Sequence, residues 1–323
     1  MKATVYHRYG SPDVLNCEEV EKPIAGDNEV LIKVRAASVN PYDWHFMRGT
    51  PYFLRLLAGL TKPKDPRLGV DVAGRVEAVG KKVTQFKPGN EVFGACRGAF
   101  AEYACAPESS LAMKPDNVTS EQASSVAIAA LTALQGLRDK GKLQAGLKVL
   151  VNGAAGGVGT FAVQIAKSFG AEVTGVCSTR NVDMVRSIGA DHVIDYTQED
   201  FIESGRRYDV ILDNVGNRSL VTFRRILNPK GIYVGAGGSA GRWMIGALAR
   251  MIAAPLLSLF GSKTMTGILA KMNQQDLNVM HDLMKSGKVK PVIDRSYKLS
   301  EVPEAIRYLE TGHARGKVVI TLE

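Results

Sequence analysis

The clearest chemical motif in this sequence is a glycine-rich turn, GAAGGVG at residues 153–159, which follows the apolar strand pattern of residues 148–152. A helix pattern continues from the turn through residues 160–169. The first amides of a helix have no partner within it and carry partial positive charge, so this turn can bind a diphosphate. We therefore expect a dinucleotide-binding loop made by Ala155, Gly156, Gly157, Val158 and Gly159.

This loop departs from the usual fingerprint, because Ala154 stands where the first glycine is expected. Gly156 still lets the backbone approach the phosphates, and Gly159 still lets the helix pack closely on the strand. An unrelated α/β protein could carry such a turn by chance. The strands and helices that alternate after it favour the dinucleotide interpretation.

The end of the second strand indicates which dinucleotide is bound. NAD-binding units commonly have Asp or Glu there, which accepts hydrogen bonds from the ribose 2′-hydroxyl. This chain has Cys177 at that position, followed by Ser178, Thr179 and Arg180. Hydroxyl donors and a guanidinium suit a 2′-phosphate, although Arg180 could instead be an ordinary solvated arginine. We predict NADPH, with Ser178 and Arg180 binding its 2′-phosphate.

The composition describes a globular chain with a basic surface. Hydrophobic residues make up 45% and charged residues 23%, and the formal net charge is +9. We find no Lys/Arg block and no basic stripe interleaved with aromatics, so we expect a solvated basic surface and no nucleic-acid partner. A non-catalytic NADPH-binding protein that uses this charge to bind RNA is the alternative from another class.

The four cysteines bear on metal binding and on location. Cys17, Cys96, Cys105 and Cys177 are widely separated, so they suit neither a zinc knuckle nor a disulfide framework. The N-terminal residues have a strand pattern and no signal-peptide core. We therefore expect a reducing, cytoplasmic location.

Two secondary-structure patterns divide the chain. Residues 1 to about 115 contain short strand patterns separated by Gly, Pro and Asn turns, as in a compact β-barrel. Strands and helices then alternate, which is typical of a doubly wound parallel sheet, and the last sixty residues are mixed. We predict an α/β protein with a Rossmann cofactor domain, residues 121–263, inserted into a substrate domain, residues 1–120 and 264–323.

An apolar stretch, WMIGALARMIAAPLLSLF, covers residues 243–260. Arg250 near its middle and Pro255 make a membrane-spanning helix costly. We predict a buried or lid-forming helix pair that makes a lipophilic wall beside the substrate. Peripheral contact with a membrane surface is a further expectation.

Four segments in a fixed order carry a family resemblance: residues 36–44 (AASVNPYDW), 69–76 (GVDVAGRV), 130–133 (ALTA) and the glycine loop. Together they resemble the medium-chain dehydrogenase/reductase superfamily, and within it the zinc-independent quinone oxidoreductase branch. The resemblance implies a GroES-like β-barrel substrate domain around the Rossmann domain, and a homodimer. It also implies that Asn40 and Thr132 lie near the nicotinamide and Tyr196 beside the adenosine phosphate. The resemblance places two loops under the cofactor, formed by Asn214, Val215, Gly216, Gly235 and Ala236.

The resemblance also bears on zinc. Zinc-dependent relatives have Cys at the position of Asn40 and a Gly-His-Glu stretch at the position of Gly69-Val70-Asp71. They also carry a four-cysteine lobe, which has no counterpart in this sequence. Asp43 and His45 remain nearby, but no third ligand is evident, and catalytic zinc needs three. We expect metal-free chemistry.

Metal-free hydride transfer requires hydrogen-bond donors for the negative charge that develops on the acceptor oxygen. Conjugated acceptors need less activation, so the expected substrate is a quinone or another α,β-unsaturated carbonyl. We expect Asn40, His45 and Tyr52 to supply the donors, and Asp43 to orient one of them or relay a proton. Each could instead be structural, as a helix cap or a packed side chain. An enone or enoyl-thioester reductase is the alternative within enzymes.

Overall fold

The computed structural model describes residues 1–237, 253–259 and 261–322. The chain forms two compact units, Met1–Ile128 with Met272–Glu323 and Ala129–Lys271. The sequence places these boundaries after residues 120 and 263. The later second boundary follows from the strand β13 (Thr264–Gly267), which pairs with β12 (Leu227–Gly235) in the sheet of the second unit.

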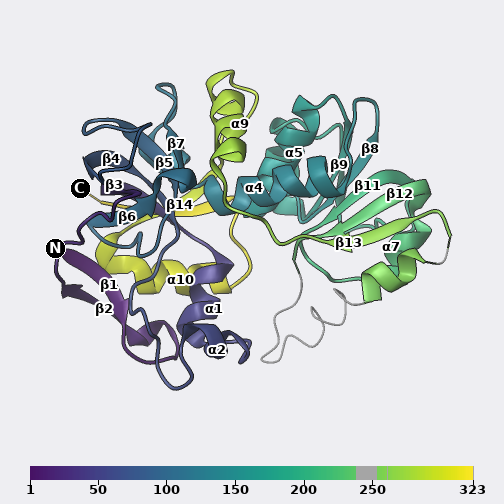
Figure 1. Ribbon diagram of the computed structural model, residues 1–323. Helices are drawn as coiled ribbons and strands as arrows, with labels where there is room; N and C mark the ends of the chain where they lie inside the picture. Colours follow the sequence, from purple (N-terminus) through teal and green to yellow (C-terminus); the bar gives the residue numbers. More distant parts are fainter. Residues whose placement is uncertain (238–252, 260, 323) are drawn as a thin grey trace. The chain divides into compact units, whose positions relative to one another are not determined.

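The first unit is built on a seven-stranded sheet (Figure 1). Its central strand β3 (Glu29–Val39) pairs antiparallel with three others, β4 (Asp71–Val79), β6 (Tyr103–Pro107) and β15 (Lys317–Thr321). The sheet is completed by β5 (Glu91–Ala95), β7 (Leu111–Met113) and β14 (Ile293–Lys298). A separate hairpin pairs β1 (Lys2–Tyr6) with β2 (Leu15–Glu19).

Alternating apolar side chains of β3 and β4 form the core of this unit, with Ile32, Val34, Val72 and Val76 buried. The helix α10 (Val302–Glu310) adds Ile306 to the same core. Four further helices belong to the unit: α1 (Pro41–Arg48), α2 (Leu54–Ala58), α3 (Ser120–Ser124) and α9 (Gln274–Lys285). The first strand and the last strand of the chain therefore lie in one unit, as the sequence pattern predicts.

The second unit contains a six-stranded parallel sheet in the order β10-β9-β8-β11-β12-β13 (Figure 1). The remaining strands are β8 (Lys148–Asn152), β9 (Glu172–Cys177), β10 (His192–Asp195) and β11 (Tyr208–Asp213). The chain moves outward from β8 through β9 to β10 and then returns to β11 on the other side of β8. The order of strands therefore reverses between β8 and β11, which confirms the predicted doubly wound fold.

Apolar residues fill the sheet of the second unit because parallel strands are covered on both faces. Leu150, Ile211 and Tyr233 share a buried cluster with Phe223 from α7 (Leu220–Arg225). The helix α5 (Gly157–Ser168) packs on β8 and β9, and α6 (Val182–Ser187) packs on β9 and β10. The helix α4 (Ala127–Gln135) continues into a π-helical turn, Gly136–Lys140, that packs on β11 and β12.

Most of the predicted apolar wall, residues 243–252 and 260, lies outside the described residues. Residues 253–258 are helical, and Ala254 is buried against the sheet cluster of the second unit. No helix among the described residues is long and apolar enough to cross a bilayer. The predicted helix pair is otherwise untested.

Candidate functional site

The glycine loop lies at the point where the strand order of the second unit reverses. It connects the end of β8 at Asn152 to the helix α5, which starts at Gly157. The residue before this helix, Gly156, has extended backbone angles, and no side chain caps the first amides of α5. In open α/β sheets, ligands bind beside this crossover point, and uncapped amides with the helix dipole favour an anion.

Two glycines of the loop serve different purposes. A Cβ at Gly159 would lie 2.0 Å from the carbonyl oxygen of Gly153 and 2.8 Å from the Ala154 Cα, so only glycine fits the turn. A Cβ at Gly156 would meet only the Gly153 oxygen, at 3.6 Å, and would otherwise enter open space. Gly159 is therefore needed by the fold of the loop, whereas Gly156 leaves room for a ligand.

A buried carboxylate, Asp213 at the end of β11, organises the neighbouring loop. Its Oδ1 accepts hydrogen bonds from Asn152 Nδ2 (2.8 Å) and from the amide of Gly216 (2.9 Å), and its Oδ2 accepts one from the Tyr233 hydroxyl (2.8 Å). These bonds fix the turn of Asn214, Val215 and Gly216 beside the glycine loop. Asp213 is not among the residues predicted from the sequence, although a polar residue at the end of an apolar strand beside the crossover indicates such a role.

The same edge holds an unused acceptor that suits a bound dinucleotide. The side-chain oxygen Oδ1 of Asn214 is buried and has no hydrogen-bond partner among the described residues, while its Nδ2 donates to the Asn152 carbonyl at 3.2 Å. Buried acceptors without partners are costly. A hydroxyl or amide of a dinucleotide would satisfy this oxygen, so the residues present fit the predicted cofactor.

The end of β9 carries no acidic side chain. Cys177 is buried there, and burial raises its thiol pKa to about 11. Ser178 and the short turn Thr179–Asn181 follow, and Arg180 is exposed. Asp195 on the neighbouring strand accepts hydrogen bonds from the Thr197 amide (3.0 Å) and from Thr179, and the Thr179 bond helps to hold the Asp195 pKa below its usual range.

The other predicted cofactor residues lie at four places in the second unit. Thr132 is half-buried on α4, and Tyr196, directly after β10, is 57% exposed. Gly235 and Ala236 are half-buried at the end of β12. The parallel strands β8 to β12 therefore bring the glycine loop, Ser178, Tyr196, Asn214 and Gly235 to one edge of the sheet, because their carboxyl ends lie at that edge.

In the first unit, a buried polar cluster surrounds the start of α1. Asn40 is the N-cap residue, Pro41 is the first helical residue, and Asp43 accepts a hydrogen bond from the Asn40 amide at 2.7 Å. The Asn40 side chain donates to Asp71 Oδ2 at 2.9 Å and to the Ser38 carbonyl at 3.2 Å. Both amide hydrogens of Asn40 are therefore engaged within the cluster.

Lys317 supplies the positive charge of this cluster. Its ammonium donates to Asn40 Oδ1 at 2.6 Å and lies 3.3 Å from Asp71 Oδ2, and both Lys317 and Asp71 are almost fully buried. The Ser38 hydroxyl and the Ile128 amide also donate to Asp71, each at 2.9 Å. Lys317 is not among the residues predicted from the sequence, because a lysine at the first position of a strand is ordinarily solvated.

Asp43 is the titratable group with the most unusual environment in the cluster. Burial raises the pKa of its carboxyl to about 7, the Asn40 amide opposes this rise, and the charge of Asp71 adds to it. Lys317 and the Gly69 amide lower the pKa. The Oδ1 atom of Asp43 is buried with no hydrogen-bond partner among the described residues. A carboxyl group of this kind exchanges a proton near neutral pH.

His45 and Tyr52 follow on the same segment. His45 Nδ1 lies 2.8 Å from the Thr50 carbonyl, which can only accept, so Nδ1 carries a proton and Nε2 is an acceptor in the neutral ring. Burial lowers the His45 pKa, which favours that neutral form. Tyr52 is 37% exposed, and its ring lies 4.9 Å from the Arg55 guanidinium. The predicted role of Tyr52 as a donor to the acceptor oxygen stays a prediction. The neutral His45 ring offers an acceptor at Nε2, so His45 would be a donor to that oxygen only when protonated.

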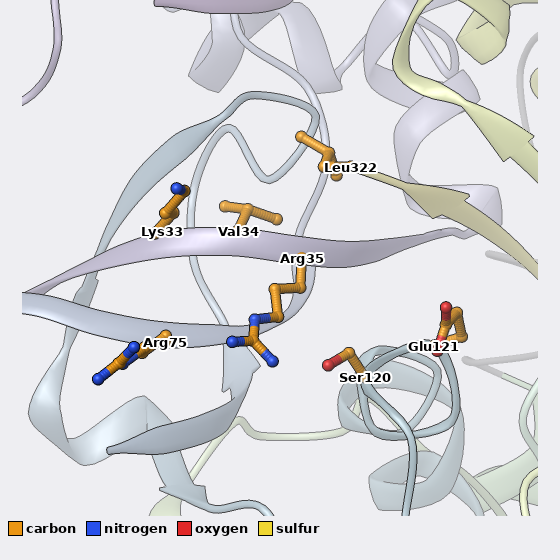
Figure 2. A pocket seen from close by; sticks show the side chains of 7 residues that line it. All are labelled: Lys33, Val34, Arg35, Arg75, Ser120, Glu121 and Leu322. Atoms are coloured by element: carbon orange, nitrogen blue, oxygen red, sulfur yellow. The ribbon is translucent and has the colours of Figure 1, made fainter. Parts of the chain in front are cut away.

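A separate pocket of about 370 Å³ lies elsewhere on the first unit (Figure 2). It is lined by Lys33, Val34, Arg35, Arg75, Ser120, Glu121 and Leu322. Arg35 is paired with Glu91 at 3.3 Å, so part of its charge is neutralised. None of the predicted site residues lines this pocket.

Among the described residues, no group of three His, Cys, Asp or Glu side chains is arranged to hold a metal ion. The second unit is a dinucleotide-type parallel sheet, and the first is a mostly antiparallel β unit with a buried polar cluster. Residues 26–116 match the alcohol dehydrogenase GroES-like domain family, and residues 188–320 match the zinc-binding dehydrogenase family.

Curated relatives and solved structures extend over the whole chain. The mouse mitochondrial NAD(P)H oxidoreductase RTN4IP1 is 35% identical, over 100% of this chain and 89% of its own length. The chloroplastic NADPH-dependent alkenal/one oxidoreductase of Arabidopsis thaliana is 35% identical, over 99% of this chain and 79% of its own. The quinone oxidoreductase of Coxiella burnetii has a TM-score of 0.88 at 31% identity, covering 100% and 99% of the two chains. The chain belongs to the medium-chain dehydrogenase/reductase superfamily, in its quinone oxidoreductase branch.

Proposed function

We propose that this protein is an NADPH-dependent reductase that transfers hydride to a quinone or another α,β-unsaturated carbonyl compound. The observation that carries this function is the uncapped glycine loop at the strand crossover, next to a β9 end without an acidic residue. The identity with an NADPH-dependent alkenal/one oxidoreductase supports the same cofactor and acceptor class. Bound NADPH would supply the hydride.

The residues of the first unit would provide the proton and the hydrogen bonds that the acceptor needs. Asp43 holds a proton near neutral pH, because its pKa is raised to about 7. Asn40 is held by Lys317 and Asp71, so we propose that it positions the start of α1 and the Asp43 carboxyl. Tyr52 carries a phenolic hydroxyl, which suits a donor to the acceptor oxygen.

Zinc-independent chemistry is part of this proposal. The Cys and the Gly-His-Glu stretch of zinc-dependent relatives are replaced in this chain by Asn40 and by Gly69-Val70-Asp71, and the side chains of Asn40 and Asp71 contact each other in the buried cluster. In this chain the cation between them is the Lys317 ammonium, at 2.6 Å and 3.3 Å from their side-chain oxygens. A conjugated acceptor is already activated, so hydrogen-bond donors suffice without a Lewis acid.

We also propose a homodimer in a reducing compartment such as the cytoplasm, with no nucleic-acid partner. The outer strand β13 has no further neighbour among the described residues, and a strand edge of this kind can pair with a second copy. All four cysteines are free, as expected in a reducing compartment.

Light scattering tests the dimer, which requires twice the chain mass of 34.8 kDa. A mass equal to one chain would exclude it.

The decisive experiment measures NADPH oxidation with menadione, phenanthrenequinone and an enone, followed by identification of each product. We expect Tyr52→Phe to lower turnover by about tenfold or more if its hydroxyl is a donor. Asn40→Ala should also lower turnover, because Lys317 and Asp71 lose a shared partner. Saturable oxidation with neither variant affected would remove both residues from the mechanism. RNA binding without turnover would instead favour the non-catalytic alternative.

Product analysis separates the two acceptor types. A quinone reductase yields the hydroquinone, whereas an enone reductase yields a saturated carbonyl compound. One relative is named an NADPH-dependent alkenal/one oxidoreductase, which is the reason for testing an enone beside the two quinones.

Cofactor selection has its own test. Arg180→Ala should lower the ratio of kcat/KM for NADPH to that for NADH by about tenfold or more, because a charge-assisted hydrogen bond to the 2′-phosphate is lost. Lys142→Ala, an exposed change on the same unit, is the control. An unchanged ratio in Arg180→Ala would remove Arg180 from the cofactor site.

A further inference from the structure

The short helix α2 in the first unit exposes its apolar side. Phe53, Leu56, Leu57 and Leu60 are 50%, 70%, 74% and 67% exposed. Phe53, Leu56 and Leu57 have the i, i+3, i+4 spacing that places side chains on one helical face, and Leu60 lies just beyond the helix, after Gly59. Such a face is normally buried against the protein. Here the apolar face meets solvent.

The opposite side of α2 is fastened to the unit by polar contacts. Arg55 Nε donates to the Gly49 carbonyl at 2.9 Å, and the Arg55 guanidinium lies 4.5 Å from the Tyr9 ring. The Tyr9 hydroxyl donates to the Gly59 carbonyl at 2.6 Å. These contacts fix the helix with its apolar face outward, so the exposure is a property of the local structure.

Basic residues border this apolar face. Lys62 and Lys64 are exposed directly after it. The segment 49–67 contains one acidic residue, Asp65, which is paired with Arg67 at 2.8 Å. Leucine and phenylalanine side chains flanked by lysines are the composition of a segment that lies in the interface of an anionic bilayer.

We propose that the α2 face, Phe53, Leu56, Leu57, Leu60, Lys62 and Lys64, docks this protein onto an anionic phospholipid membrane. The leucines and Phe53 would enter the boundary between headgroups and acyl chains, and the two lysines would contact phosphate and carboxylate groups. Charge complementarity selects this occupant over a second copy of the chain, because the copy would carry the same basic border and a formal net charge of +9. Binding is measured without substrate, so the proposal stands or falls independently of the reductase function.

The experiment is co-sedimentation of the full chain with vesicles of phosphatidylcholine alone and of phosphatidylcholine mixed with phosphatidylserine. We expect binding to the mixed vesicles, weakened by added salt. Leu56→Glu/Leu57→Glu should reduce binding by about tenfold or more, because two apolar anchors become charged. Lys62→Glu/Lys64→Glu should reduce it mainly at low salt.

The matched control is Ile24→Glu/Leu269→Glu, which adds the same two charges at residues that are 91% and 88% exposed elsewhere on the chain. This control should bind vesicles as the unchanged protein does. Thermal melting verifies that each variant folds, which is expected because all six replaced side chains are exposed. The proposal is overturned if the unchanged protein does not sediment with the mixed vesicles, or if the α2 variant and the control bind equally. It is also overturned if the α2 variant converts a dimer to a monomer, since a second copy would then cover the face.

Discussion

At the scale of residues, the first unit concentrates two carboxylates and one ammonium in a buried space. Asp71 is paired with Lys317 and accepts three further hydrogen bonds, whereas Asp43 Oδ2 accepts one from the Asn40 amide and its Oδ1 has no hydrogen-bond partner among the described residues. Burial is the main cause of the raised Asp43 pKa of about 7, and the amide hydrogen bonds and the Lys317 charge offset only part of that rise. Its protonation therefore affects both stability and turnover.

The stability of the protein should fall as pH rises toward 7 through Asp43. In the unfolded chain this carboxyl ionises near the usual aspartate pKa of 3.8, whereas in the folded chain it stays protonated to about 7. Between these values the folded state binds more protons, so its advantage is full at low pH and is lost as pH increases, by at most about 1.4 kcal/mol per pH unit. Asp43→Asn removes this contribution. Urea unfolding of both proteins from pH 5 to 8 should show their difference in unfolding free energy changing in favour of the variant up to about pH 7 and levelling off above it. A constant difference from pH 5 to 7 would contradict the assignment.

The charges around Asp43 should shift its titration in opposite directions. Lys317 on β15 lowers the Asp43 pKa and Asp71 on β4 raises it, while Tyr6 on β1 and Tyr42 on α1 also face this carboxyl. If Asp43 donates the proton, turnover falls as pH rises through its pKa. Lys317→Met should move this fall to higher pH, and Asp71→Asn should move it to lower pH.

The double variant Lys317→Met/Asp71→Asn provides the control for that experiment. It removes one charge of each sign, so its pH profile should return toward that of the unchanged protein. Loss of a purely structural contact would reduce turnover at every pH without opposite shifts. Shifts in the same direction for both single variants would contradict the assignment to Asp43.

At the scale of elements, parallel strands and a glycine turn build the cofactor edge. β8 and β11 end side by side at the crossover, and α5 starts there with uncapped amides. Asp213 joins β8, β11 and β12 through Asn152, Gly216 and Tyr233. Hydrogen bonds within the second unit therefore hold the loops of the cofactor edge in place without a bound ligand.

Two alanine substitutions in the loop should have different effects. Gly159→Ala should lower the free energy of unfolding by about 1–3 kcal/mol and weaken NADPH binding, because its Cβ would overlap the Gly153 carbonyl. Gly156→Ala should leave stability nearly unchanged but still weaken NADPH binding, because its Cβ enters the space for the phosphates. Chemical unfolding and fluorescence titration with NADPH measure the two effects. Undiminished NADPH affinity in Gly156→Ala would place the diphosphate elsewhere.

At the scale of the whole molecule, the chain leaves its first unit, builds a parallel sheet and returns to complete the first sheet with β14 and β15. The return strand brings Lys317 to Asn40, which is 277 positions away in the sequence. The insertion of one unit into the other therefore completes the polar cluster. Family membership supports a reductase, and the buried Lys317 ammonium is the observation behind the proposal that it needs no zinc.

Removal of metal should leave the activity of the whole protein intact. We expect treatment with a strong chelator to change neither NADPH oxidation nor the melting temperature, because Lys317 supplies the positive charge between Asn40 and Asp71. Elemental analysis of protein purified from zinc-supplemented medium should find substoichiometric zinc. One zinc ion per chain, with activity lost on chelation and restored by zinc, would contradict the metal-free mechanism.

The sequence by itself determined the parallel sheet, the glycine turn and the family, because those depend on local periodicity and on motifs that are contiguous in the chain. It also placed Asn40, Asp43, His45 and Tyr52 in one segment. Only the tertiary structure decided which hydrogen bonds these side chains make. The Asn40 side chain bonds to Lys317 and Asp71, and His45 donates through Nδ1 to the Thr50 carbonyl. Burial and pairing over long sequence separations set these properties, and no local pattern encodes them.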